Sequence, residues 1–282
     1  MKIKKLFEEL ASRTWEVIPL TKKLNISYGE KSITSHNLLE ISRRKYGTIR
    51  VIETPGGQPE SKTGLDWEFW IQYKDGWRRF AVQAKKVKVN KTKYYYDFGY
   101  LVGTGASKKR QFDILKQYAN ANNSIPLYCL YNNLSLDPHA SPHIDKKILE
   151  DDWRCSQEFE VEQLGCTFVR VSKNLEKIVY VVPGKGGTWS SPFQDIYKAC
   201  KVYPWRCLLC DYGSIYSSCN RQDPPPLAEE EEVGYYSDLP PALRNAIQSG
   251  SFSEWPRNLY SYDLGHFPGQ VFILENSRID SL

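Results

Sequence analysis

Hydrophobic and polar residues alternate along two neighbouring stretches of the chain, residues 63–71 and 80–85. Alternation with a period of two is typical of strands that bury one face. The Asp75-Gly76 pair lies between the two stretches. An Asp-Gly pair favours a two-residue hairpin turn, because both central positions of such a turn need positive φ. The pattern therefore predicts a β-hairpin.

Counting outward from a loop made of Asp75 and Gly76 predicts which residues pair across the hairpin. The pairs are Lys74 with Trp77, Trp70 with Ala81, Glu68 with Gln83 and Asp66 with Lys85. Because side chains alternate across a strand, one face is expected to carry two acids, an amide and a lysine: Asp66, Glu68, Gln83 and Lys85. The opposite face is apolar and carries Trp67, Phe69, Ile71, Phe80, Val82 and Ala84.

The same reasoning divides the rest of the chain into helices and strands. Helices are predicted over residues 1–18, 108–122, 191–201 and 240–248, with further helical signals at 28–34 and, after a Ser35 cap, at 38–41. Strands are predicted over residues 48–54, 125–131, 165–171, 177–182 and 271–274. A long loop rich in tyrosine, lysine and glycine, residues 88–107, is expected to follow the hairpin.

This order predicts four parts of the chain. Residues 1–24 form an N-terminal helix, residues 25–135 an α/β core, and residues 136–220 an α+β extension of that core. Residues 221–282 begin with a proline-rich and acidic stretch and are predicted to be a linker and a tail.

Composition and charge allow a large core and a polyanionic partner. The chain has 282 residues, 41% of them hydrophobic, and a formal net charge of +5. Its basic residues gather after the hairpin, at Lys85, Lys86, Lys88, Lys91, Lys93, Lys108, Lys109 and Arg110. They form either a solvated surface or a rim that contacts phosphates. The tyrosines among them, Tyr94, Tyr95, Tyr96 and Tyr100, either stack on bases or pack as a lid.

Other features of the sequence bear on compartment and on further metal or phosphate sites. No stretch approaches the roughly 18 apolar residues that span a bilayer, and seven cysteines in a chain without a signal peptide favour the cytoplasm. Zinc binding by Cys207 and Cys210 is the less favoured alternative to buried structural cysteines, and His139 with His143 is expected to be part of a loop. Residues 183–188 lack the spacing of a phosphate loop.

The polar face of the hairpin suits a hard cation. Carboxylate and amide oxygens are the ligands that Mg²⁺ prefers, and substrate phosphate can complete its shell. Bound metal can then generate a nucleophilic water and offset charge on phosphorus. The alternative is a plain surface hairpin with an Asp66–Lys85 ion pair, of the kind that contributes roughly 0.2–1 kcal/mol.

These residues resemble a known superfamily. Gly64-x-Asp66 on one strand and Gln83-Ala84-Lys85 on the next are similar to the motif of the PD-(D/E)xK nucleases, which have a restriction-endonuclease-like αβββαβ core with a mixed central sheet. Over residues 25–135 the chain is also similar to an uncharacterised, mostly bacterial family of restriction-like proteins. The motifs that carry this likeness are Gly29-Glu30-x-Ser32-Ile33-Thr34, Glu60-x-x-Thr63-Gly64-x-Asp66-Trp67-Glu68, Val82-Gln83-Ala84-Lys85 and Pro126-Leu127-Tyr128-Cys129.

The resemblance implies a role for each matching residue. Metal would be held by Asp66, Gln83, the Ala84 carbonyl and the helix glutamate Glu30, and Lys85 would be the catalytic lysine. Glutamine replaces the usual acid at position 83, so Glu68 is expected to supply the missing charge. Substrate would contact Lys86, Lys88, Lys108, Lys109, Arg110 and Gln111.

The sequence therefore predicts a Mg²⁺- or Mn²⁺-dependent nuclease that cleaves DNA, with RNA as an open alternative, in defence against foreign DNA. A second hypothesis is a non-catalytic nucleic-acid-binding or scaffold protein that retains the nuclease fold. A third is a module that contacts a partner protein of a defence system through residues beyond about 140.

Overall fold

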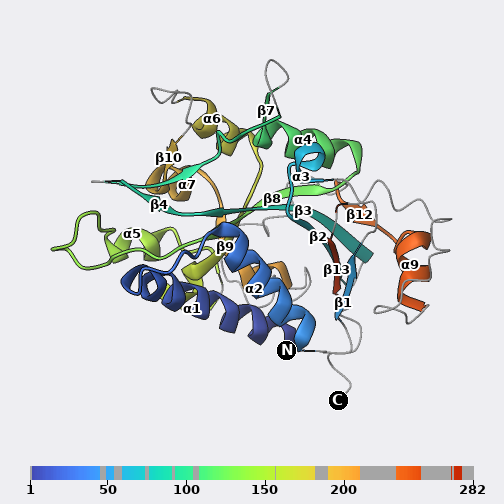
Figure 1. Cartoon of the computed structure of the whole chain (residues 1–282), viewed down its shortest axis with the longest axis horizontal. Coiled ribbons are helices and arrows are strands. Elements are labelled where there is room, and N and C mark those ends of the chain that lie inside the picture. Colours follow the sequence, from blue (N-terminus) through green and yellow to red (C-terminus); the bar gives the residue numbers. More distant parts are fainter. Residues whose placement is uncertain are drawn as a thin grey trace.

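The computed structural model describes residues 2–44, 49–53, 59–73, 76–90, 93–103, 108–155, 157–181, 190–209, 233–248, 268 and 270–274. A mixed sheet lies at the centre, with helices on both of its faces (Figure 1). One face carries α1 (Lys2–Lys23) and α2 (Glu30–Arg43), and the other carries α3 (Glu60–Thr63), α4 (Gln111–Ala121), α6 (Lys173–Val181) and α7 (Phe193–Ala199). The predicted α/β class with a mixed central sheet is confirmed.

The central sheet has the strand order β1–β13–β2–β3–β8–β9–β11, and β12 pairs with the start of β3. The strands are β1 (Ile49–Glu53), β2 (Trp67–Tyr73), β3 (Gly76–Lys86), β8 (Ile125–Tyr131), β9 (Cys166–Arg170), β11 (Val202–Pro204), β12 (Tyr235–Tyr236) and β13 (Gln270–Leu274). β2 and β3 are antiparallel, whereas β3 and β8 are parallel. A parallel pair needs a crossover connection, and α4 supplies it.

The last strand, β13, lies inside the sheet and not in a separate tail. It runs parallel to β2 and antiparallel to β1, with Val271 opposite Glu68. Residues 271–274 are all buried hydrophobic residues. A continuous apolar run is typical of a strand covered on both faces. The end of the region predicted as linker and tail therefore completes the core.

The predicted hairpin forms, but its register differs by two residues. Glu68 pairs with Ala81 and Tyr73 pairs with Gly76, so the loop residues are 74–75, which lie outside the described part of the chain. Gly76 is the first residue of β3, with φ 142°, and a Cβ there would lie 2.6 Å from the Tyr236 carbonyl oxygen of β12. The absence of a side chain at Gly76 therefore leaves room for β12. A shift of two leaves every side chain on its predicted face.

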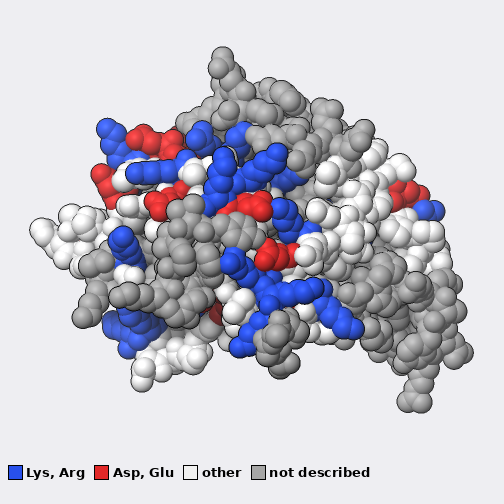
Figure 2. All heavy atoms as spheres, turned by 90° about the horizontal axis from the view of Figure 1, so that it is seen from above, with Lys and Arg blue, Asp and Glu red and all other residues white. Residues whose placement is uncertain are grey.

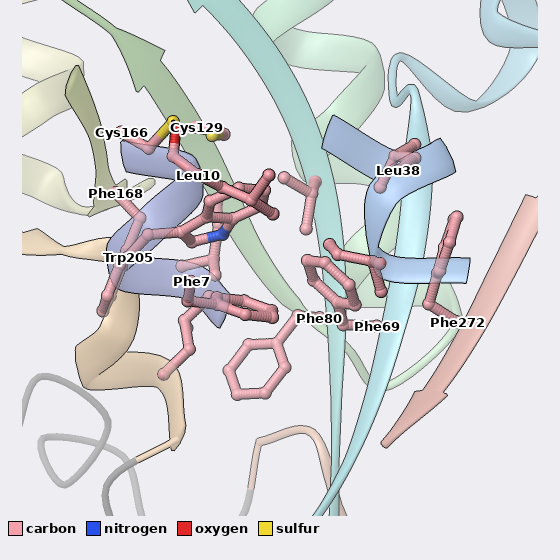
Figure 3. Packing of buried hydrophobic residues seen from close by; sticks show 14 of the residues in the cluster. Phe7, Leu10, Leu38, Phe69, Phe80, Cys129, Cys166, Phe168, Trp205 and Phe272 are labelled. Atoms are coloured by element: carbon pink, nitrogen blue, oxygen red, sulfur yellow. The ribbon is translucent and has the colours of Figure 1, made fainter. Parts of the chain in front are cut away.

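The apolar face of the hairpin packs against the two N-terminal helices. Phe69 and Phe80 from the hairpin meet Phe7 and Leu10 from α1, and Phe272 from β13 closes one side (Figure 3). Trp205, in the 3₁₀ helix Trp205–Leu209, packs against Phe7 with ring centroids 4.7 Å apart. Burial of large aromatic side chains dominates the stability of such a core.

On the opposite face, α4, α6 and α7 cover the sheet. Leu175 and Val179 are buried, and they lie four residues apart on one side of α6. The strand predicted at 177–182 is therefore wrong where it is described, because helical spacing of the buried residues decides the element. The other described helices are α5 (Lys146–Asp151), the 3₁₀ helix Val161–Gly165, which contacts α1, and α9 (Pro241–Gln248).

The segment after the hairpin is more ordered than the predicted loop. It contains β4 (Lys88–Val89), β5 (Tyr94–Asp97), β6 (Leu101–Val102) and β7 (Lys109–Arg110), which pair as β10–β5–β4, with β10 at Ser190–Pro192, and as β6–β7. Tyr94 and Tyr96 are buried in the core on the α4 side. Because Tyr94 and Tyr96 are buried, they are not accessible for stacking on bases. Tyr100, which is 57% exposed, is accessible.

Helix α2 begins at Glu30 after a Gly29 cap and runs without a break to Arg43. Its buried positions Ile33, Asn37 and Ile41 follow one helical stripe, so Ser35 lies inside the helix and the predicted Ser35 cap is wrong. The other predicted helices and strands are confirmed within a few residues of their ends. The described helices include none with the length and apolar character of a membrane span.

Candidate functional site

The site lies where β2 begins and β3 ends, on the face covered by α4. Asp66 immediately precedes β2, and its backbone N–H donates to the Val82 carbonyl. Its Oδ2 accepts hydrogen bonds from the Ala84 backbone N–H and from Gln83 Nε2, both at 2.8 Å. The structure thus brings together three of the predicted residues, Asp66, Gln83 and Ala84.

Gly64 holds this corner against α4. It ends the single turn α3 in the left-handed conformation, with φ 70°. A Cβ at Gly64 would lie 2.5 Å from Leu115 N and 2.8 Å from the Gln111 carbonyl oxygen. Only glycine tolerates both the positive φ and this approach of two backbones. The Gly64-x-Asp66 motif therefore fixes the distance between the start of β2 and α4.

Lys85 points into the site from β3 and is 6% exposed. Its Nζ donates to Gln111 Oε1 at 2.7 Å and lies 3.7 Å from Glu30 Oε1. The ring of Tyr100 lies beside the ammonium group, 5.9 Å from its centroid. The amide of Gln111 and the carboxylate of Glu30 therefore hold the Lys85 side chain in place from two sides.

Glu30 reaches the site from the first turn of α2. Its Oε2 accepts a hydrogen bond from the Lys86 backbone N–H at 2.8 Å. Lys86 turns to the opposite side of β3, where its Nζ donates to the Tyr28 carbonyl oxygen at 2.6 Å. Glu30 therefore lies close to Lys85, as the resemblance implies, and also ties α2 to the end of β3.

Gln111 and Glu60 complete the site. Gln111 Nε2 donates to Glu60 Oε1 at 2.6 Å and to Gln83 Oε1 at 3.0 Å. Glu60 was not among the predicted site residues. The sequence signal for it was its place as the first residue of the Glu60-x-x-Thr63-Gly64-x-Asp66 motif, six residues before Asp66.

Glu68 does not join the site. It is fully buried, and its Oε1 accepts from Arg79 Nη2 at 2.7 Å and from the Tyr118 hydroxyl at 2.8 Å. Trp70 Nε1 donates to the other oxygen at 3.3 Å. The charge of Glu68 is neutralised by a buried arginine, so the expectation that it supplies the charge missing at Gln83 is corrected.

Burial raises the pKa of Asp66 to about 7. The neighbouring carboxylates Glu60 and Glu30 add to the rise, while the Ala84 N–H and the Lys85 ammonium oppose it. Asp66 is thus desolvated and close to other carboxylates. A cation bound there would offset the repulsion between these negative charges.

A pocket of about 330 Å³ opens above these groups. It is lined by Glu30, Glu60, Lys85 and Gln111, with Lys31, Lys86, Lys88, Ser61, Asp97, Tyr100 and Val102 around them. A second, more open hollow of about 780 Å³ is lined by Lys108, Lys109, Arg110 and Lys116. The β6–β7 ribbon contributes Val102 to the first and Leu101 to the second, so it stands between them.

The predicted basic rim surrounds these hollows. Figure 2, which looks onto the face with α3, α4 and β7, shows Lys and Arg side chains gathered around a few acids. Lys108 and Lys109 are exposed, whereas Lys88 pairs with Asp97 at 3.0 Å. Burial lowers the pKa of Lys86, and Glu30 opposes the shift. Lys91 lies outside the described residues.

The sequence also offered other metal and phosphate sites, of which only some residues are described. In the described ranges, no three His, Cys, Asp or Glu side chains are placed to hold a metal ion together. His143 Nδ1 donates to the Ala140 carbonyl oxygen in an exposed loop. Cys210, the predicted zinc partner of Cys207, and the loop at 183–188 lie outside the described part of the chain.

Of three comparisons with known proteins, one finds a match. No curated protein and no solved structure matches it significantly. The model of one family, described as a family of unknown function (DUF6615), matches residues 3–270, and the chain belongs to this family.

Proposed function

We propose that the chain is a metal-dependent nuclease that hydrolyses phosphodiester bonds of DNA, acting in defence against foreign DNA. The observation that supports this most is the hydrogen-bonded series Asp66–Gln83–Gln111–Lys85, in which Lys85 and Gln111 line a pocket that further lysines also line. Carboxylate, amide and ammonium groups converge there from two adjacent strands, and a polyanion can approach over the basic rim.

The order of elements supports the same proposal. α2, β1, β2, β3, α4 and β8 follow one another as αβββαβ, apart from the single turn α3 and the small strands between β3 and α4. The proposed resemblance to restriction-endonuclease-like cores rests on this order and on the parallel β3–β8 pair. The order of strands within the sheet departs from this pattern, because β13 lies between β1 and β2, which are consecutive strands in the chain.

The donors present fit a hard cation. Asp66 Oδ2 and the Ala84 carbonyl oxygen lie 2.8 Å and 3.2 Å from the same atom, Gln83 Nε2, so the two oxygens already converge on one point. All the candidate ligands are oxygens, as Mg²⁺ and Mn²⁺ prefer. Asp66, the Ala84 carbonyl and the Gln83 side-chain oxygen would hold the ion, with Glu30 nearby.

Each side chain then has a defined task. A bound Mg²⁺ lowers the pKa of a coordinated water and offsets charge on the phosphate. Lys85 presents its ammonium group to a phosphate oxygen or to the attacking water, and Glu30 and Gln111 hold that group in place. Lys108, Lys109 and Arg110 bind phosphates that flank the reacting one.

Cleavage of plasmid and linear DNA with Mg²⁺ or Mn²⁺ tests the proposal. Asp66→Asn and Lys85→Met should each reduce cleavage by about a hundredfold or more, since each removes a charged group from the reaction. Lys147→Met, on the exposed side of α5, is the matched control and should cleave like the wild type. Unchanged cleavage by both site variants, or no cleavage by the wild type on DNA or RNA, contradicts the proposal.

A second candidate is a nucleic-acid-binding or scaffold protein without catalysis. Its motivating observation is that Gln83 brings no charge and donates its N–H groups to Asp66 and to the Ala84 carbonyl. On this alternative, binding to DNA or RNA persists in EDTA and falls steeply with salt. Binding that needs divalent metal, together with cleavage, decides against it.

A further inference from the structure

Four side chains of the site form a directed chain of hydrogen bonds. Lys85 Nζ donates to Gln111 Oε1 at 2.7 Å, Gln111 Nε2 donates to Gln83 Oε1 at 3.0 Å, and Gln83 Nε2 donates to Asp66 Oδ2 at 2.8 Å. All the described partners of the two amides agree with this one direction. We infer that Gln111 is a positioning residue that sets the direction of the Gln83 amide and thereby closes the cation site.

The direction of Gln111 follows from the chemistry of its neighbours. An ammonium group can only donate, so Lys85 requires the oxygen of Gln111. An ionised carboxylate can only accept, so Glu60 Oε1, at 2.6 Å, requires its nitrogen. Gln111 is also buried and starts α4, so it has little room to turn. Lys85 and Glu60 together fix the Gln111 amide.

The direction of Gln83 follows from Gln111. If the Gln83 amide turned over, two NH₂ groups would face each other at the 3.0 Å contact with Gln111. Its oxygen would also face the Ala84 carbonyl oxygen and, when Asp66 is ionised, Asp66 Oδ2, which repel it unless a cation lies between them. Without metal, the nitrogen of Gln83 therefore occupies the point on which these oxygens converge.

This closed arrangement has a consequence for metal binding, which rests on the proposed function. A cation enters only when the Gln83 amide turns its oxygen inward, and the Gln111 contact opposes that turn. The observed metal affinity is then the intrinsic affinity multiplied by the fraction of molecules in the open state. Gln111 thus acts as a gate on the metal through Gln83.

A metal-free measurement tests the gate first. In EDTA, the Gln83 NH₂ protons and the Ala84 backbone N–H donate to the same oxygen, so NMR should show a cross-relaxation peak between them. Saturating Mg²⁺ should remove this peak in the wild type, and Gln111→Met should weaken it in EDTA. A peak that is absent from the metal-free wild type, or equally strong in Gln111→Met, overturns the inference.

Binding of Mn²⁺ tests the effect on affinity, and the concentration of free Mn²⁺ is measured by electron paramagnetic resonance. Gln111→Met removes the contact with Gln83 and leaves the net charge unchanged, so binding should tighten about three- to tenfold, the equivalent of one neutral hydrogen bond. Gln194→Met, on the exposed side of α7, is the control and should bind as the wild type does. Unchanged or weaker binding by Gln111→Met contradicts the gate.

The two proposals can fail separately. If neither Mn²⁺ nor Mg²⁺ binds the wild type, the metal-dependent nuclease is wrong, while the metal-free NMR peak still decides whether Gln111 directs the Gln83 amide. If metal binds and DNA is cleaved but the Gln111→Met values equal those of the wild type, the nuclease stands and the gate is wrong.

Discussion

One polar face of the hairpin divides into two sites with different chemistry. Asp66 and Gln83 meet at the open end beside Lys85, whereas Glu68, on the same face, is enclosed by Arg79 and Tyr118. The alternation of side chains predicted the shared face correctly. It did not predict the partners, because a register shift of two residues keeps the face and changes every neighbour.

Glu68→Gln should therefore destabilise the protein without abolishing the proposed DNA cleavage. The change removes the carboxylate that pairs with the buried Arg79, and breaking a buried ion pair typically costs about 3–5 kcal/mol. Urea unfolding measures the loss, and cleavage is compared with the wild type at a temperature where both are folded. A variant as stable as the wild type, or one that is folded and inactive, contradicts this assignment of Glu68 to a structural ion pair.

Stability without metal should depend on pH through Asp66. Its pKa is raised to about 7 in the folded protein, mainly by burial, from an ordinary value near 4. The folded state therefore holds this proton more tightly than the unfolded state. The contribution of this proton to the free energy of unfolding is fully present below the pKa of Asp66 in the unfolded chain. It is lost as pH rises through about 7, the pKa in the folded protein.

Urea unfolding in EDTA between pH 5 and 8 checks this sign. The free energy of unfolding of the wild type, taken relative to Asp66→Asn, should fall as pH rises, because the asparagine cannot ionise. A difference between the two proteins that is constant with pH, or that grows toward pH 8, contradicts the raised pKa.

At the scale of elements, the length of a periodic stretch decided what the sequence could predict. α4 and β8 were predicted because each carries a clear pattern over many residues. The four-residue turn α3 carries no such pattern, so Glu60 was not predicted although its carboxylate holds Gln111. Gly64, which ends that turn, was part of the motif, but its contact with α4 depends on tertiary structure.

Gly64→Ala should loosen the joint between β2 and α4. The left-handed φ of 70° costs about 1–2 kcal/mol for a residue with a Cβ, and the 2.5 Å approach to Leu115 N forces a backbone shift on top of that. Since α4 carries Gln111, cleavage should fall together with stability. Thermal unfolding and cleavage measure both effects.

Gly29→Ala is the matched control for this change. Gly29 has φ −80°, and nothing lies within 4 Å of the position that a Cβ would take there, so alanine should cost at most about 1 kcal/mol as a poorer helix cap. If Gly64→Ala is no less stable than Gly29→Ala, the close approach of β2 and α4 is not a constraint on the fold.

At the scale of the whole molecule, the sequence predicted the strands better than their order. The run Val271–Leu274 was predicted as a strand, and its burial confirms why it is apolar on both sides. A strand's pattern states which faces are buried and carries no information on which strand lies beside it. The place of β13 between β1 and β2 is therefore a finding of the structure.

A chain that ends at residue 269 should fail to fold, because β13 joins β1 to the rest of the sheet. Its loss would leave β1 without its only sheet partner in the described structure and would expose Phe69 and Trp70 on β2. Ile273→Ala, a milder change at a fully buried position, should cost about 2–5 kcal/mol. Circular dichroism and thermal unfolding of both proteins measure this. A truncated chain that unfolds cooperatively at the wild-type temperature would show that β13 is not needed to complete the sheet.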